Sequence, residues 1–172
     1  MEITLWRRYS YHDIDNVVAA LKREYGEELS FNLCGSVGTG HWAARSCIEH
    51  NIPFHVYLSF TSEVISQHWS ESQKQDLNNQ INNARSCSIV DPVSNSWIAG
   101  RFQEKNEQMI DNANFVISFW VGKRQGQTFD AMNYALEQSK FVFNGLDALR
   151  PIFKENLGRG WSPPTVIGYN DE

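Results

Sequence analysis

The chain has 172 residues, of which 41% are hydrophobic and 20% are charged, and its formal net charge is −5. This composition is typical of one folded domain that buries its own core, and it excludes a disordered chain. The acidic balance also argues against a generic basic nucleic-acid-binding protein, because neutralising phosphates requires clustered Lys and Arg.

The sequence has no run of about 18 apolar residues and no apolar signal segment in its first ten residues, which predicts a cytoplasmic protein without a membrane span. Cys34, Cys47 and Cys87 are odd in number and widely spaced, unlike a disulfide framework or a zinc site. We therefore interpret the cysteines as small buried apolar residues. No metal and no cofactor is expected.

In the first part of the chain, short apolar runs alternate with amphipathic stretches. Residues 3–6 predict a strand. Asp13 is expected to cap a helix that ends before Gly26 and whose apolar side chains recur at helical spacing, namely Ile14, Val17, Val18, Leu21 and Tyr25. The elements expected next are a strand over 29–34, a helix over 41–50 and a strand over 54–60.

The second part of the chain continues the alternation. Residues 70–84 are polar apart from a few apolar positions on one side, which predicts a surface helix. The apolar run FVISFWV at 115–121 is typical of a strand buried on both faces. Thr128 is expected to cap the helix that follows. The remaining expected elements are a strand over 87–90, a helix over 99–113 that buries Phe102, Met109 and Ile110, and a strand over 141–143.

Strict alternation of strands and helices predicts a single-domain α/β fold with one doubly wound, mostly parallel sheet of at least five strands and helices on both faces. The domain is expected to cover residues 1–150. Residues 151–172, which are rich in Gly and Pro, are expected to form an irregular tail. Ligands bind such sheets at the carboxyl ends of the strands, near the switch in strand order, so the loops after the strands are the places to search.

The first of these loops carries glycines between a strand and a helix start. Glycine permits a positive φ and close approach of a ligand, and the helix N-terminus behind Gly38 offers free N–H groups to a phosphate. The spacing GxxGxG differs from the dinucleotide fingerprint, and the loop lacks a Walker lysine, so a turn needed only for packing is an equal alternative. His41, at the helix start, offers a neutral imidazole to a ligand, with packing or solvation as the alternative.

Two further segments carry cationic or N–H groups. Arg101 and Lys105 are i,i+4 neighbours on one helix face, and Asn106 follows. Nearby Glu104 and Glu107 leave a solvated, salt-bridged face as the alternative. The loop 122–128 brings the N–H groups of Gly126 and Gln127 to a helix start, together with Lys123 and Arg124; its alternative is a solvent loop with an ordinary cap.

The order of these motifs resembles the YpsA-like branch of the SLOG superfamily, whose relatives include DprA and the Lonely Guy phosphoribohydrolases. The family pattern has GxD-x-WAA after its second strand, then FQERNxxMxD before a buried strand, and then a GGT turn. This chain has GTGHWAA at 38–44, FQEKNEQMID at 102–111 and GQT at 126–128. The resemblance covers about residues 29–145 and implies a Rossmann-like fold that binds nucleotides or nucleotide-derived signals, often as a dimer.

The resemblance also implies which residues bind the ligand, and it shows three departures from the family pattern. Gly40 replaces an acidic residue, Gln127 replaces the middle glycine of GGT, and Ala131 stands where the phosphoribohydrolases have a catalytic glutamate. Asp130 is the remaining weak candidate for a catalytic carboxylate. The expected ligand-binding residues from motifs and resemblance together are Gly35, Ser36, Gly38, His41, Arg101, Lys105, Asn106, Gly126, Gln127 and Thr128.

The main functional hypothesis is a non-catalytic module that binds a nucleotide-like small molecule and senses or sequesters it. The resemblance implies a setting in immune or phage–host conflict, and a homo-oligomer as the working assembly. One alternative is a nucleotide N-glycosidic hydrolase, which needs a carboxylate at the sugar; Asp91, Glu104 and Asp130 lack the family spacing. A second is DprA-like binding of single-stranded DNA, in which Trp42, Trp97 and Trp120 would stack on bases, although the acidic balance makes nucleic acid an unexpected partner.

Overall fold

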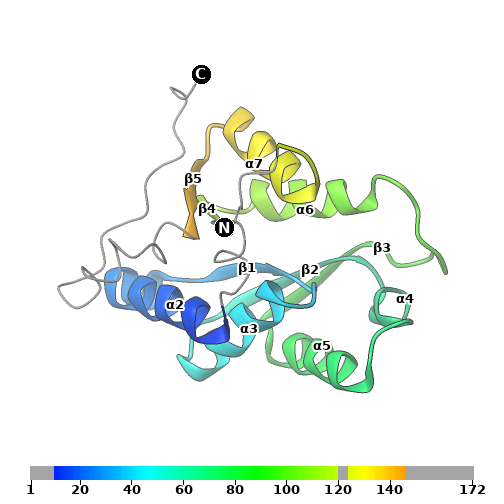
Figure 1. The fold of residues 1–172 in the computed structure, drawn as a ribbon, viewed down its shortest axis with the longest axis horizontal. Helices are drawn as coiled ribbons and strands as arrows, with labels where there is room; N and C mark the ends of the chain where they lie inside the picture. The colour runs from blue at the N-terminus through cyan, green and yellow to red at the C-terminus, as the bar shows by residue number, and fades with distance from the viewer. Residues whose placement is uncertain (1–9, 120–123, 146–172) are drawn as a thin grey trace, which may run out of the picture.

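The computed structural model describes residues 10–119 and 124–145 (Figure 1). The expected strand at 3–6, the expected tail at 151–172, and Trp120 and Lys123 lie outside the described residues. The elements in chain order are α2 (Tyr11–Tyr25), the 3₁₀ turn η1 (Gly26–Glu28), β1 (Phe31–Cys34), α3 (Thr39–Glu49), β2 (Phe54–Phe60), α4 (Ser62–Ser66), α5 (Glu71–Asn83), β3 (Ser86–Asp91), α6 (Arg101–Asp111), β4 (Phe115–Ser118), α7 (Gln127–Glu137) and β5 (Phe141–Asn144).

All strand pairs are parallel, as the alternation of strands and helices predicts. The first three strands form one sheet in the order β1-β2-β3, with Phe31 opposite Phe54 and His55 opposite Ser86. β4 and β5 form a second pair, in which Phe115 lies opposite Phe141. Successive strands are added in one direction from β1 to β3, and β4 begins a separate pair. The switch in strand order of a doubly wound fold therefore falls between β3 and β4.

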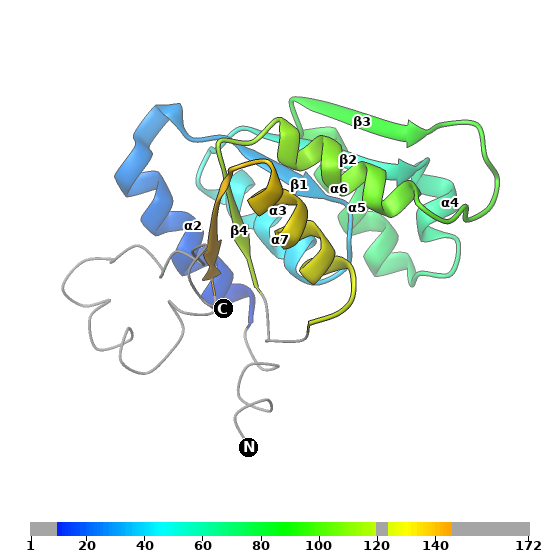
Figure 2. The same ribbon diagram turned by 90° about the horizontal axis from the view of Figure 1, so that it is seen from above.

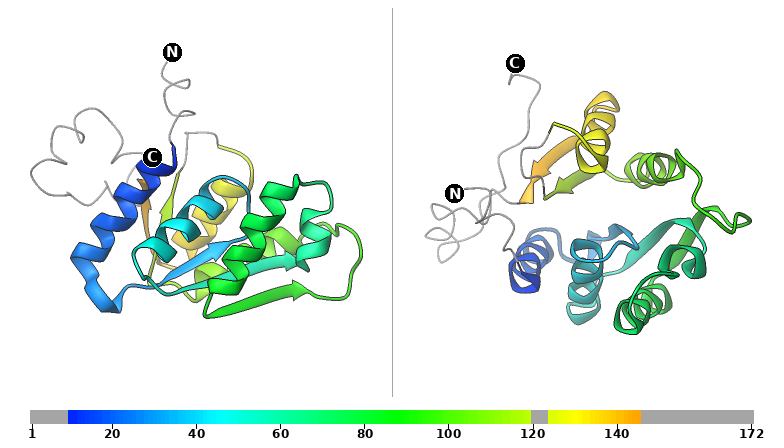
Figure 3. Two further views of the ribbon diagram at one scale, coloured as in Figure 1. Left: turned by 90° about the horizontal axis from the view of Figure 1, so that it is seen from below. Right: turned by 45° about the vertical axis from the view of Figure 1, so that its right-hand side comes forward.

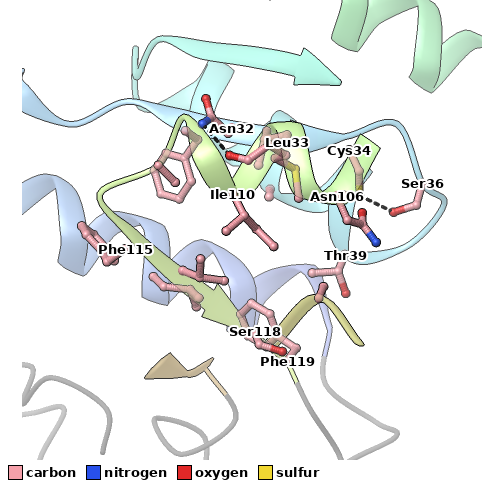
Figure 4. A pocket seen from close by; sticks show the side chains of 18 of the residues that line it. Asn32, Leu33, Cys34, Ser36, Thr39, Asn106, Ile110, Phe115, Ser118 and Phe119 are labelled. Atoms are coloured by element: carbon pink, nitrogen blue, oxygen red, sulfur yellow. Dashed lines mark hydrogen bonds between the residues drawn. The ribbon is translucent and has the colours of Figure 1, made fainter. Parts of the chain in front are cut away.

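The expected single sheet of five strands is wrong in one respect, because within the described residues no ladder joins β1 to β4. Instead, the Asn32 side chain on β1 donates from Nδ2 to the carbonyl oxygens of Met109 and Asn112 at the end of α6, at 3.1 Å each. These bonds hold the end of α6 against the outer edge of β1, and a cavity separates β1 from β4 (Figure 4).

Helices cover both faces of the strands (Figures 1 and 2). Helices α2, α3 and α5 lie on one face, where Figure 3 shows them side by side. On the other face α6 packs over β1, β2 and β3, and α7 packs over β4 and β5. The predicted α/β class with helices on both faces is confirmed.

The main core lies between the three-stranded sheet and helices α2, α3 and α5. The apolar stripe that the sequence predicts on α2 is buried at four of its positions, and Tyr25, at the helix end, is exposed. β2 is buried along most of its length because it is the middle strand. A smaller cluster joins α6, α7 and β5 through Ile110, Met132, Ala135 and Val142.

Three details of the predicted elements are wrong. Ser10, not Asp13, is the N-cap of α2; Asp13 is the N3 residue whose carboxylate accepts from the Ser10 backbone N–H at 2.8 Å, completing a capping box. Gly126, not Thr128, is the N-cap of α7, at φ +96°. The strand within 115–121 ends at Ser118, and Phe115, Val116 and Ile117, which line the cavity between β1 and β4, are only half-buried.

No helix in the described part of the chain is long and apolar enough to cross a membrane.

Candidate functional site

A cavity of about 490 Å³ lies between β1 and β4, at the switch in strand order (Figure 4). Strand β1 forms one wall and β4 the other; α6 and the first turn of α7 complete it, and α2 closes it from behind. The walls are mostly apolar, with Leu33, Ile110, Phe115, Ile117 and Phe119 among the lining residues. A mostly apolar lining with a few polar groups is typical of small-molecule sites.

Three of the polar side chains in this lining are buried, and others, such as Asn32, Ser36 and Thr39, are more exposed. Lys105 and Asn106, on the inward face of α6, are each 7% exposed, and Ser118, at the end of β4, is 8% exposed. The Ser118 hydroxyl oxygen is buried and has no hydrogen-bond partner among the described residues. A buried hydroxyl without a partner is costly, so its place in the cavity wall is informative.

Lys105 is the charged residue in the lining of this cavity. Its ammonium lies 5.6 Å from the centre of the Phe102 ring, a cation–π contact. None of the ion pairs formed by the described residues includes Lys105. A buried ammonium without a carboxylate partner favours an anion bound beside it, because the anion offsets the cost of removing the charge from water.

Two helices begin at the cavity wall. Thr39 and Gly40 in the first turn of α3, and Gln127 and Thr128 in the first turn of α7, are lining residues. Each helix has a glycine N-cap with a positive φ, Gly38 at +90° and Gly126 at +96°, so no side chain caps either helix. The positive ends of two helix dipoles and their first-turn N–H groups therefore adjoin the same cavity.

Gly40 has a local reason to be glycine. A Cβ atom built there would lie 2.6 Å from the Cys34 carbonyl oxygen and 2.9 Å from the Ser36 hydroxyl. The first turn of α3 therefore packs directly against the end of β1.

The structure brings five of the predicted ligand-binding residues to this cavity: Ser36, Lys105, Asn106, Gln127 and Thr128. Gly126 adjoins it as the N-cap of α7. Gly38 and His41 line a different cavity, between α3 and α5. Gly35 is buried against Leu58 and Leu77.

Arg101 is engaged outside the cavity lining. Its guanidinium pairs with the carboxylates of Asp91 at 3.2 Å and Glu104 at 3.1 Å. Asp91 also accepts from the backbone N–H and the hydroxyl of Ser94, and these bonds, together with Arg101, lower the pKa of the Asp91 carboxyl to about 2. Asp91 and Arg101 thus fix the loop between β3 and α6.

The carboxylates considered for catalysis do not reach this cavity. Asp130 is exposed on α7, and Glu104 is engaged with Arg101. None of the described residues that line the cavity is Asp or Glu. Among the described residues there is also no cluster of three or more potential metal ligands.

Sequence reasoning missed several polar residues at the cavity, among them Asn32, Thr39 and Ser118. Ser118 was visible in the sequence as the one polar residue in the apolar run FVISFWV. A serine within such a run indicates a hydrogen-bond partner or a binding site, because burying an unpaired hydroxyl is less favourable than burying an apolar side chain.

No family model and no curated protein matches this chain. Among solved structures, the chain is similar to DNA processing protein A (DprA) from Streptococcus pneumoniae, with a TM-score of 0.60 and 14% sequence identity. The alignment covers 91% of this chain and 54% of that protein, so the chain spans about half the length of the protein it resembles. The similarity shows the fold, which is Rossmann-like.

Proposed function

We propose that this chain binds a nucleotide-derived small molecule in the cavity between β1 and β4. The observation that carries the proposal is the group of three buried polar side chains, Lys105, Asn106 and Ser118, in the lining of a mostly apolar cavity. An apolar body with an anionic group matches this arrangement, and a nucleotide combines a flat ring with a phosphate.

The two helix starts support a phosphate-bearing ligand in particular. The first turns of α3 and α7 both contribute lining residues, so a phosphate between them would accept from backbone N–H groups of both. The Lys105 ammonium would add a charge-assisted hydrogen bond. The resemblance to the YpsA-like branch of the SLOG superfamily points to the same class of ligand.

Binding without turnover is the version of this function that the residues favour. Cleavage of an N-glycosidic bond requires a carboxylate or an equivalent group at the sugar, and none of the described lining residues carries one. We therefore propose that the chain senses or sequesters its ligand. DprA is named for DNA processing, but the candidate site here suits a mononucleotide better, because its polar groups lie inside a cavity rather than along a basic groove.

The first experiment identifies a ligand directly. The purified full chain is denatured, and the released small molecules are analysed by mass spectrometry. Isothermal titration then measures binding of adenosine monophosphate, guanosine monophosphate, ribose 5-phosphate and inorganic phosphate to the stripped, refolded protein. We expect a nucleotide to bind more tightly than inorganic phosphate, because only the nucleotide also fills the apolar part of the cavity.

A pair of variants locates the site. Lys105→Met keeps the length of the side chain and removes its charge, and should weaken nucleotide binding about ten- to a hundredfold, the usual value of a hydrogen bond to an ion. Lys74→Met makes the same change on α5, where Lys74 pairs with Glu71 away from the cavity, and should leave binding unchanged. Equal binding by the parent and Lys105→Met, or no binding of any nucleotide, would contradict the proposal.

A further inference from the structure

The outer edge of strand β3 is open. Strand β3 pairs with β2 along one side, and among residues 10–119 and 124–145 no strand pairs with its other side. Figures 2 and 3 show β3 at the margin of the ribbon, on the side of the three-stranded sheet away from β1. The backbone N–H and C=O groups along such an edge are available to a further strand.

Strand β3 lacks the features that usually protect an exposed edge. Natural proteins place Lys, Pro or a charged side chain on such strands, which prevents another strand from pairing with them. Between Arg85 and Asp91 the sequence is Ser-Cys-Ser-Ile-Val, which contains no charge and no proline. The side chains of residues 86–89 are exposed. A second strand can therefore pair with β3 without burying a charged group.

The loop after β3 adds an apolar surface at one end of this edge. Val93 is 84% exposed and Trp97 is 53% exposed. The Trp97 ring stacks on Phe102 with a centroid distance of 4.3 Å, and it lies 5.9 Å from the ring of Phe60, which is opposite Asp91 in the sheet. An exposed tryptophan that is held in place by its neighbours is typical of the residues that dominate protein–protein interfaces.

The charges at the two ends of β3 are complementary. At its start, Arg85 is exposed and forms no ion pair with any residue of the described ranges. At its end, the Arg101 guanidinium pairs with the carboxylates of Asp91 and Glu104, at 3.2 and 3.1 Å, and these three groups leave one net negative charge. A second copy that runs antiparallel along β3 brings Arg85 of each copy to the negative end of the other, twice by symmetry.

We propose that β3 is the contact surface of a homodimer, in which the two β3 strands pair antiparallel across a two-fold axis. The register that places Arg85 opposite Asp91 of the partner subunit also places Ser88 opposite its own copy, because Ser88 is midway between them. The two three-stranded sheets then form one continuous sheet, and β1 with its cavity lies at each outer end. The proposal does not rest on the proposed function.

Cysteine cross-linking tests both the pairing and its register. All variants carry Cys87→Ser, which removes the exposed native thiol of β3. In the proposed register, Ser88→Cys places two thiols directly opposite each other, with Cα atoms about 4.5–5.5 Å apart, which a disulfide can bridge. Ser86→Cys is the matched control: it lies on the same face of β3, but the two copies are about 13 Å apart along the strands.

The full-length variants are oxidised with copper phenanthroline and separated by non-reducing electrophoresis. We expect a disulfide-linked dimer from Ser88→Cys, and monomer from Ser86→Cys and from Cys87→Ser alone. Cross-linking of Ser86→Cys to the same extent as Ser88→Cys would overturn the proposal, and so would the absence of a linked dimer from Ser88→Cys.

Sedimentation equilibrium measures the dimer without a cross-link. The parent chain should have the mass of two chains at high concentration. Ser88→Lys brings two ammonium groups opposite each other and should raise the dissociation constant of the dimer about tenfold or more. Ser72→Lys makes the same change at an exposed position of α5 and should leave the constant unchanged.

A parent chain that stays monomeric at every concentration would overturn the proposal, and so would equal dissociation constants of the parent and Ser88→Lys. None of these outcomes bears on the nucleotide site, because no nucleotide is present in the experiments and the cavity lies at the opposite edge of the sheet.

Discussion

The Ser46 hydroxyl donates a hydrogen bond of 2.6 Å to Oδ1 of Asp15, and this bond ties α3 to α2. Ser46 is fully buried, and His50 reaches the same carboxylate oxygen at 2.9 Å. Burial raises the pKa of the Asp15 carboxyl, but the hydrogen bonds from Ser46 and His50 outweigh burial, so the pKa lies below its ordinary value.

Ser46→Ala should therefore raise the pKa of Asp15 and lower the free energy of unfolding by about 1–2 kcal/mol at pH 7. A carboxyl with a lowered pKa stabilises the fold above its unfolded-state pKa and loses that contribution as the pH falls through the folded-state value. The variant should thus lose stability at a higher pH than the parent during acidification. Urea unfolding and ¹³C NMR of the carboxyl measure both effects, with the exposed Ser72→Ala as control. An unchanged Asp15 titration in Ser46→Ala would contradict this reading.

A second prediction concerns Ser118 and Ser59, whose buried hydroxyls have no hydrogen-bond partner in the part of the chain that the structure describes. Ser118 lines the cavity between β1 and β4, whereas Ser59 on β2 does not. Removing an unsatisfied buried hydroxyl relieves its desolvation cost, so Ser118→Ala and Ser59→Ala should each leave the free energy of unfolding unchanged or raise it by about 1 kcal/mol. Only Ser118→Ala should weaken nucleotide binding, as measured by calorimetry. Equal affinities of the two variants would remove Ser118 from the site.

A third prediction concerns Gly35, where neighbouring side chains fill the space that a Cβ atom would occupy. A Cβ atom there would overlap Cδ2 of Leu58 and lie 3.0 Å from Cδ1 of Leu77. Gly35→Ala should therefore destabilise the fold by about 1–3 kcal/mol, the usual cost of overpacking. In the double variant Gly35→Ala/Leu58→Ala, the shorter side chain at position 58 makes room for the new Cβ atom. Its loss of unfolding free energy, measured by urea unfolding, should therefore be smaller than the sum of the losses in the two single variants. Simple additivity would show that Gly35 is not needed for this packing.

A fourth prediction concerns the loop that Asp91 and Arg101 fix. Because the pKa of Asp91 is lowered to about 2, its carboxylate contributes stability above the unfolded-state pKa of about 3.9 and loses it as the pH falls toward 2. The stability difference between the parent and Asp91→Asn should therefore be constant from pH 7 to 5 and shrink below pH 4. Glu24→Gln, at an exposed position on α2, is the control. A difference that does not change with pH would rule out a role for the Asp91 charge.

Local sequence signals predicted the helices and strands well. The apolar stripe of α2 and the apolar run of β2 recur at the periods of a helix and of a buried strand, and both elements form where they were expected. The ends were less predictable: Ser10 and Asp13 both suit a helix start, and only the capping-box bonds show which residue is the cap. Gly126 and Thr128 likewise both suit the start of α7, and the backbone geometry shows that Gly126 is the N-cap.

The sequence predicted the loops of the candidate site, but it did not predict how the strands and helices that form its walls pack together. The glycine turn before α3 and the turn before α7 adjoin one cavity because both follow parallel strands. Among the described residues no ladder joins β1 to β4, and the Asn32 side chain on β1 bonds to Met109, 77 residues further along, a contact that no local pattern encodes. The position of His41 in the other cavity likewise depends on how α5 packs against α3.

Val37 lines both cavities, so the turn before α3 forms part of the wall of each. Residues 36–38 therefore separate the cavity between β1 and β4 from the cavity between α3 and α5. If nucleotide binding shifts this turn, the shift changes the shape of the other cavity, and thermodynamic linkage makes any such coupling reciprocal. Amide hydrogen exchange of α5 with and without nucleotide measures whether binding on one face of the sheet reaches the other.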